Sequence, residues 1–275
     1  MKNAIELFSS TPSLLKIGSG EIKKIYVGNK DVTSMYIGNT LVYSLGDTPN
    51  IPTPPITDGL TCWLDARSLS DFTSGGTWID LSGNGNNGSI AEAQLVSLEN
   101  GILNGSGYIN IPNPTKGLSD YTVEVGFKDL STGYWIGLWG NTSGTTGNST
   151  YRDNGFYNGY PVPMTESASK TEREYYTVVV KDNRADIYFN GLLLCKNRCT
   201  LTPSDANYFV FMARKPNNAT QDTNGGADVK RAEWYFLRIY DRALTADEVM
   251  SNYTYETSLN RGTSNVEEVK PIDRS

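Results

Sequence analysis

The sequence predicts an all-β protein in which two antiparallel sheets pack face to face, with a small β-hairpin unit before them and one short helix after them. Apolar and polar residues alternate in many short segments, such as "LTCWLD" and "YTVEVGFK". This alternation is typical of strands that bury one face. The chain contains 27 Gly and 17 Tyr among its 275 residues, a composition that favours strands joined by tight turns.

The N-terminal unit, residues 1–45, contains an internal repeat. "KIYVGNKDV" at 24–32 is followed ten residues later by "SMYIGNTLV" at 34–42. Each copy has the pattern of a strand, a Gly-Asn turn and a second strand, which predicts two β-hairpins. A unit of this size buries too little apolar surface to be stable alone, so we expect it to pack against a partner, a symmetry mate or the main domain.

A stiff linker is predicted at residues 46–58. The stretch "GDTPNIPTPPITDG" contains four prolines. Proline fixes φ and removes a backbone donor, so such a stretch favours an extended segment without secondary structure. We therefore place the main domain at residues 59–256.

Strands follow one another closely through the main domain. After the two strands quoted first, "EYYTVVVKD" and "RADIYFNGLLL" are predicted to meet at Asp182-Asn183, and the second contains an Asn190-Gly191 turn typical of two-residue hairpins. "NYFVFMA" and "AEWYFLRIYD" are two further strands rich in aromatic residues. The number and spacing of these strands predict the two-sheet sandwich.

The one predicted helix begins in "TADEVMSNY". Thr245 is its N-cap and Glu248 lies three residues further on, which is a capping box. We expect this helix to close one end of the sandwich, and Arg238 and Arg242 before it to pair with nearby carboxylates such as Asp241. The polar tail, residues 257–275, is expected to lie over a surface or to be mobile.

Charge and composition exclude several classes of function. A net charge of −6 argues against a nucleic-acid partner, because binding phosphates needs a basic face. No apolar run approaches the ~20 residues that span a bilayer, so no membrane partner is expected. The N-terminus has no continuous apolar segment, which predicts a chain without a secretion signal that is made in a cytoplasm. The chain contains no His, so neither zinc sites nor His-based catalysis are expected.

The ordered set of segments resembles a known fold family. "DGLTCWLDA", "WIDLSGNGNNG", "GYINIP", "YTVEVGFK", "IYFNGLLL" and "LRIYDRALTADEV" resemble, in that order, the concanavalin A-like lectin/glucanase jelly roll, and within it the laminin-G-like branch. The resemblance runs from about Asp58 to Met250. It implies that the sandwich is a jelly roll with a lectin-like character.

The repeat in residues 1–45 resembles short modules of bacteriophage virion proteins, where they precede a variable C-terminal domain. That resemblance implies contacts with other virion proteins, a homotrimer, and a jelly roll that projects outward and binds host glycans. We therefore expect a non-enzymatic virion structural protein, such as a fibre, appendage or decoration subunit, located in the virion and made in the host cytoplasm. The alternatives are a free bacterial carbohydrate-binding protein and a glycoside hydrolase.

The stretch "WIDLSGNGNNGSI" at 78–90 has two interpretations. Laminin-G-like relatives often hold calcium near this corner, so the resemblance implies a structural calcium, the one cofactor considered, with hard oxygen ligands from Asp80, Asn84 and Glu233. Tyr235 stands where the family often has an Asp ligand. The favoured interpretation is a tight corner: glycines adopt positive φ, and Asp80 and the Asn side chains bind the local backbone. The glycines concerned are Gly83, Gly85 and Gly88.

Candidate ligand-binding residues lie in residues 140–163, the longest interval without a strand pattern. Aromatic faces can stack on sugar rings while polar groups select hydroxyls, so we expect glycan binding here. A protein–protein surface, or a loop folded back onto the sandwich, fits the same composition. The candidates are Tyr151, Arg152, Asp153, Phe156, Tyr157 and Tyr160.

No catalytic residues are predicted. Glucanases of this fold use carboxylates that alternate along one strand, so that acid and nucleophile lie close together. Glu172 and Glu174 have this spacing, but Arg173 stands between them where the glucanase pattern has an acid. A solvated, charged strand end is the better interpretation, and the chain is expected not to be an enzyme.

Overall fold

In the residues that it describes, the computed structural model is all-β apart from one helix and one 3-10 turn, as the sequence predicts. It describes residues 51–130, 136–141, 149–152, 156–157, 173–196, 201–213, 231–259 and 261, together with six short strands between residues 16 and 44. The chain divides into two compact units, Met1–Pro52 and Thr53–Ser275. Within the described part of the chain, no helix combines the length and apolar character needed to cross a membrane.

The strands of the Met1–Pro52 unit form three antiparallel pairs. The second and third pairs correspond to the two copies of the repeat, with the Gly-Asn dipeptides between their strands. Both hairpins predicted from the repeat are therefore present as paired strands. The pairs are β1 (Lys16–Ile17) with β2 (Gly20–Glu21), β3 (Tyr26–Val27) with β4 (Lys30–Asp31), and β5 (Ser34–Ile37) with β6 (Thr40–Ser44).

The described residues of the Thr53–Ser275 unit form one continuous antiparallel ladder of thirteen strands. Each main-domain strand predicted from the sequence is present. β9, the strand that precedes "GYINIP", was not predicted, and the expectation that 140–163 lacks strands is wrong, because β13 and β14 lie there. The strands are β7 (Leu60–Asp65), β8 (Thr77–Trp78), β9 (Gly88–Glu99), β10 (Ile102–Pro112), β11 (Tyr121–Asp129), β12 (Ile136–Gly140), β13 (Ser149–Arg152), β14 (Phe156–Tyr157), β15 (Glu174–Lys181), β16 (Arg184–Phe189), β17 (Leu192–Cys195), β18 (Tyr208–Phe211) and β19 (Ala232–Tyr240).

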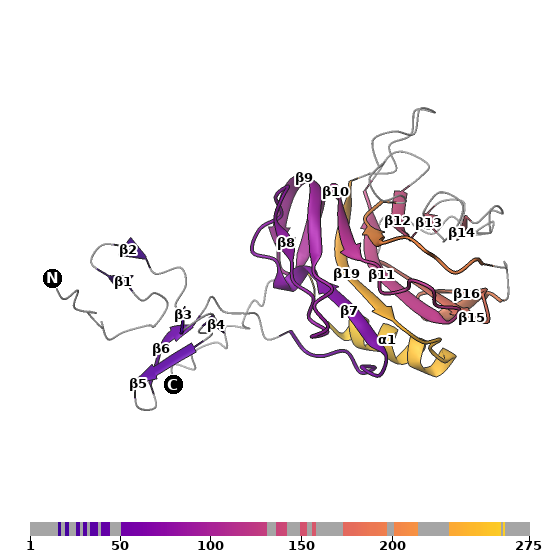
Figure 1. The fold of residues 1–275 in the computed structure, drawn as a ribbon, viewed down its shortest axis with the longest axis horizontal. Coiled ribbons are helices and arrows are strands. Elements are labelled where there is room, and N and C mark those ends of the chain that lie inside the picture. Colours follow the sequence, from indigo (N-terminus) through magenta and orange to yellow (C-terminus); the bar gives the residue numbers. More distant parts are fainter. Residues whose placement is uncertain are drawn as a thin grey trace, which may run out of the picture. The chain divides into compact units, whose positions relative to one another are not determined.

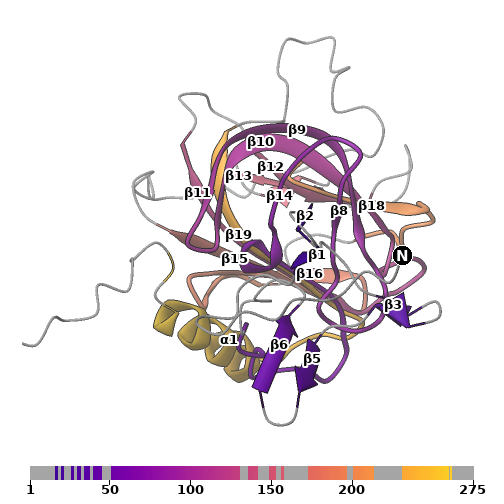
Figure 2. The same ribbon diagram turned by 90° about the vertical axis from the view of Figure 1, so that its left-hand side faces the viewer.

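The ladder folds over on itself to make the two layers of a sandwich (Figures 1 and 2). One layer has the order β7-β19-β11-β15-β16-β17, and the other has the order β9-β10-β18-β12-β13-β14. The layers meet where Leu103–Gly105 of β10 pair with Ala232–Trp234 of β19. The predicted two-sheet architecture is confirmed, with the addition that the sheets share a hydrogen-bonded corner.

The hydrophobic core lies between the two layers. Along β11, Tyr121, Val123, Val125 and Phe127 are all buried in it, while the residues between them face away. Aromatic rings join the layers: Phe211 of β18 meets Trp234 of β19 edge to face, with ring centroids 5.4 Å apart.

The helix α1 (Ala246–Ser258) begins as predicted. Thr245 Oγ1 accepts a hydrogen bond from the Glu248 amide at 3.3 Å, and Glu248 Oε2 accepts one from the Thr245 amide at 2.8 Å. The predicted capping box is confirmed. Glu248 also pairs with Arg242 at 2.7 Å.

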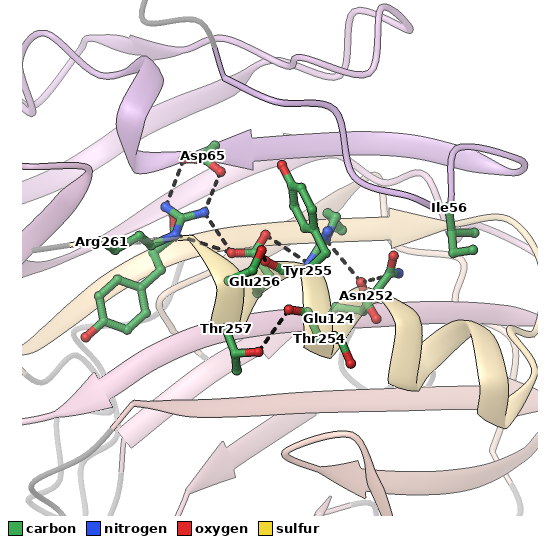
Figure 3. Close-up of polar contacts among 12 residues, drawn as sticks. Ile56, Asp65, Glu124, Asn252, Thr254, Tyr255, Glu256, Thr257 and Arg261 are labelled. Carbon is green, nitrogen blue, oxygen red and sulfur yellow. Dashed lines mark hydrogen bonds and ion pairs between the residues drawn. The ribbon is translucent and has the colours of Figure 1, made fainter.

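The helix covers the outer face of the β7-β19-β11 layer through buried charges (Figure 3). Arg261, just after the helix, reaches Asp65 on β7 at 2.7 Å and Glu256 on the helix at 3.0 Å. Arg238 on β19 lies 3.1 Å from both Glu256 and Glu124 of β11. These five residues form the buried ion-pair network, and each is at most 3% exposed.

The Asp65 carboxyl makes the stability of the fold depend on acidity. Burial alone would raise its pKa, but the hydrogen bond from Arg67 and the charge of Arg261 lower the pKa to about 2. The Asp65 carboxyl therefore takes up a proton more readily in the unfolded chain, where its pKa is near 3.8. Its contribution of about 2 kcal/mol is complete above about pH 5 and disappears as the pH falls towards 2.

Denaturant unfolding at about pH 6 and about pH 2.5 measures this contribution. The wild type is expected to lose about 1–2 kcal/mol more than Asp65→Asn over this interval, because the amide does not titrate. The comparison removes the effects of other acids, such as Glu124, whose pKa is raised by burial and whose contribution has the opposite sign. Equal losses in the two proteins would contradict the role of Asp65.

Candidate functional site

The residues predicted to bind sugar lie at one edge of the second layer. Tyr151 and Arg152 belong to β13, and Phe156 and Tyr157 belong to β14, which is the last strand of that layer. Asp153 and Tyr160 lie outside the described residues. The structure thus brings four of the six candidates together on two neighbouring strands (Figure 1).

Strand register shows which positions share a face. A row of paired residues crosses five strands, from Asn110 of β10 through Val210, Gly140 and Ser149 to Tyr157 of β14. Residues paired across neighbouring strands lie on the same face of a sheet. Val210 packs with Tyr108 and Ala213, apart from the main core, so this row lies on the outer face.

The two-residue period of the strands separates the four candidates. Position 151 lies two residues from Ser149 and shares the outer face with position 157. Positions 152 and 156 alternate with them; Thr150, which pairs with Phe156, pairs on its other side with the buried Trp139. Only Tyr151 and Tyr157 therefore occupy outer-face positions, and Arg152 and Phe156 occupy positions of the core-facing side.

Further residues of this outer face were not predicted. Tyr208 of β18 is 47% exposed, and Tyr108 of β10 is half-buried against Val210. The Oδ1 atom of Asn110 is buried without a hydrogen-bond partner among the described residues. We call the outer side of these strands, with Tyr108, Asn110, Tyr208, Val210 and positions 151 and 157, the tyrosine face; Tyr208 is exposed on it, and Val210 is buried. Exposed aromatic rings beside amide and hydroxyl groups can bind a ring that has both apolar and polar edges.

A signal for these residues exists in the sequence. In "GYINIP" and "NYFVF", tyrosine and asparagine alternate with Ile and Phe, which are buried in the core. The outward positions of a strand follow from this alternation. The pairing of β10 with β18, which places Asn110 beside Val210 and Pro112 beside Tyr208, does not follow from the sequence.

The Gly/Asn stretch folds as a tight corner, the favoured interpretation. The Asp80 carboxylate accepts hydrogen bonds from the amides of Trp63, Ser82 and Asn86 at 2.8–2.9 Å. The side-chain amide of Asn84 donates to the Leu60 carbonyl at 2.9 Å. These contacts tie the corner to β7.

The three glycines of the corner have two different roles. Gly83 and Gly85 have φ of 85° and 77°, as predicted. The prediction of positive φ is wrong for Gly88, which is needed instead for space, since a Cβ there would lie 2.5 Å from Ile109 Cγ2.

The predicted calcium ligands do not form one site. Asp80 binds the amide of Trp63, which pairs with Arg238, and Glu233 lies five residues before Arg238 on β19. Five strand residues span on the order of 15 Å. Glu233 accepts a hydrogen bond from Tyr235 at 2.8 Å instead. Among the described residues, no group of three His, Cys, Asp or Glu side chains is placed to hold a metal.

The comparisons with known proteins concern the fold. No protein-family model matches the sequence, and a search of curated proteins found no match. Among solved structures, Trypanosoma rangeli sialidase in complex with 2,3-difluoro-KDN has a TM-score of 0.56 and 17% identity, over 77% of this chain and 36% of that one. The chain thus spans about a third of the sialidase.

Two other solved structures are similar over a larger share of their own length. Domain 4 of AbnA, a GH43 extracellular arabinanase from Geobacillus stearothermophilus in complex with arabinotriose, has a TM-score of 0.52 and 16% identity, over 70% of this chain and 98% of that one. A protein described as HCR/D-Sa-GBL1/C has a TM-score of 0.52 and 13% identity, over 72% and 52%. At these identities the likeness establishes the fold alone.

The prediction that the chain is not an enzyme is contradicted. The solved structures that share its fold include sialidases and an arabinanase, which are enzymes. The prediction relied on one missing pattern, the alternating carboxylates of glucanases, and a fold can carry other catalytic arrangements. Of the two acids considered, Glu174 is 2% exposed at the start of β15, and Glu172 lies outside the described residues.

Proposed function

We propose that the Thr53–Ser275 unit binds carbohydrate, and that the tyrosine face is the binding surface. The observation that carries the proposal is the exposure of Tyr208, 47% of whose surface is accessible on a strand whose neighbours Phe209 and Phe211 are fully buried. Large aromatic side chains that a sheet leaves in contact with solvent often mark a binding surface. The likeness to an arabinanase domain that holds arabinotriose supports the same proposal.

The side chains of the tyrosine face favour a neutral sugar. Tyr108, Asn110, Tyr208 and Val210 are all uncharged. Tyrosine rings offer an apolar face for the C–H side of a sugar. We therefore propose neutral oligosaccharides as the class of ligand.

A substitution at Tyr208 tests the binding surface. Tyr208→Ala is expected to weaken binding of a neutral oligosaccharide about tenfold, because a stacked ring contributes about 1.4 kcal/mol. Tyr208→Phe keeps the ring and should change affinity by about threefold or less. A glycan array that includes arabinotriose selects the ligand, and calorimetry measures the affinities. An array on which the wild type binds no sugar, or equal affinities for all three proteins, would refute the proposal.

Glycoside hydrolysis is the second candidate, because sialidases and an arabinanase share the fold. The test is release of new reducing ends from any polysaccharide that the chain binds. Release that is lost in Tyr208→Ala would make the tyrosine face part of an active site. Binding without release would assign it to recognition of that polysaccharide alone.

The place of the protein in a bacteriophage virion is a further proposal. It is supported by the repeat in residues 1–45, whose two copies pair as hairpins, and by the resemblance of that repeat to virion modules. We propose that this unit attaches a homotrimer to other virion proteins, and that the sandwich binds glycans of the host surface. Light scattering of the full chain should then give three times the mass of one chain, and a monomer would argue against it.

A further inference from the structure

Four polar residues, three of them buried, form a closed ring of hydrogen bonds beside the tyrosine face. The Asn141 side-chain amide donates to Thr115 Oγ1 at 2.7 Å, and Thr115 Oγ1 donates to Asn113 Oδ1 at 2.8 Å. The Asn113 side-chain amide then donates to Ser204 Oγ at 3.2 Å, and Ser204 Oγ donates to the Asn141 carbonyl. Each hydroxyl donates one bond and accepts another, so the ring is closed without conflict.

The ring lies where three separate segments converge. Asn113 and Thr115 follow β10, Asn141 follows β12, and Ser204 precedes β18. Asn141 and Thr115 are fully buried, and Ser204 is 2% exposed. Buried polar groups cost stability unless every partner is in place, so a fully satisfied ring fixes one arrangement of these segments.

The tyrosine face depends on this arrangement because β12 connects β18 to the edge strands, and the ring holds the end of β12 at Asn141. The ladder between β12 and β18 contains two residue pairs, Trp139 with Phe211 and Gly140 with Val210. On its other side β12 pairs with β13, and β13 pairs with β14. The positions of Tyr151 and Tyr157 relative to Tyr208 are therefore set through β12.

We infer that the ring of Asn113, Thr115, Asn141 and Ser204 positions the edge strands β13 and β14, through β12, relative to the sugar-binding surface at Tyr208. The four residues do not touch the ligand and act by holding the end of β12. The inference rests on the proposed carbohydrate binding. It also assigns a structural role to Asn141, whose N-x-Ser sequence pattern would otherwise indicate a glycosylation site.

Two substitutions at Thr115 distinguish the effect of the ring's hydrogen bonds from the effect of packing. Thr115→Val removes both hydrogen bonds of the hydroxyl, whereas Thr115→Ser keeps the hydroxyl and loses a methyl group. Thr115→Val is expected to weaken binding of the array-selected oligosaccharide about tenfold at a temperature where both variants are folded. It should also speed amide exchange of residues 136–140 and 149–152 about tenfold. Thr115→Ser should resemble the wild type in both measurements.

The two measurements distinguish the failure of this inference from the failure of the proposed function. Unchanged affinity in Thr115→Val, or unchanged amide exchange in β12 and β13, would overturn the positioning role while sugar binding stands. A wild type that binds no sugar would refute the proposed function and the inferred role in binding with it, whereas amide exchange would still report whether the ring holds β12. Ser204→Ala opens the ring with a smaller defect and replaces Thr115→Val if that variant does not fold.

Discussion

Replacing Arg238 with alanine is expected to lower the free energy of unfolding by about 3–5 kcal/mol. Arg238 is the cation between Glu124 and Glu256, at 3.1 Å from each carboxylate. All three side chains are at most 4% exposed. Without the guanidinium, two buried carboxylates face each other with one fewer positive charge, and water cannot reach them to compensate.

The charge of Arg238, and not only its volume, accounts for this expectation. Burial is the largest influence on Glu124 and raises its pKa, while Arg238 is the main opposing influence. The Arg238 guanidinium also lies 4.3 Å from the centroid of the Phe236 ring, a cation–π contact that alanine removes. In Arg238→Met, the Glu124→Gln change should therefore recover part of the loss, because it removes the carboxylate that Arg238 paired, whereas Glu256 keeps its ion pair with Arg261.

Arg242 provides the matched control. Its side chain is 27% exposed and pairs with Asp58 and Glu248, at 86% and 25% exposure. Solvent weakens such pairs, so Arg242→Ala should cost about 1 kcal/mol or less. Chemical denaturation at neutral pH measures both variants. A cost for Arg238→Ala no larger than that for Arg242→Ala would show that the buried ion-pair network contributes nothing beyond a surface pair.

Strand and helix positions were predictable because their signals are local. β7 was predicted from alternation within six residues, and the start of α1 from Thr245 and Glu248 alone. The partner of Arg238 was not predictable in this way. Asp241 is the nearest acid in the sequence, but it lies three residues away, and an odd separation along a strand places two residues on opposite faces. The actual partners come from β11 and α1.

Only one edge of the candidate site was predicted, because only local signals can be read from the sequence. The composition of residues 140–163 predicted ligand binding, because aromatic residues lie close together in that part of the chain. Tyr108 and Tyr208 are one hundred residues apart in the sequence, and only the pairing of β10 with β18 brings their strands together. The ring around Asn141 is also non-local, because its members come from three segments. Pairing between distant strands depends on the whole fold and cannot be predicted from any one segment.

Gly126 is a position where adding a side chain is expected to destabilise the fold strongly. It pairs with Phe236 across β11 and β19, and the Phe236 ring lies over it. A Cβ at residue 126 would lie 2.4 Å from Phe236 Cε1 and 2.8 Å from Cδ1. The ring has little freedom to move, because Tyr175 stacks on it with centroids 6.1 Å apart and the Arg238 guanidinium lies 4.3 Å from its centroid.

Gly126→Val should therefore destabilise the fold by about 2–3 kcal/mol through overpacking. Phe236→Ala alone should cost about 3–5 kcal/mol, since it empties a buried position between Tyr175 and Arg238. In the double variant the valine occupies part of the space that the ring leaves, so the combined loss should be smaller than the sum by at least about 1 kcal/mol. Unfolding free energies of the four proteins in this cycle give the coupling. Additive losses would mean that the Phe236 ring is not the reason why position 126 is a glycine. The outer face of β11 could then accept a side chain at that position.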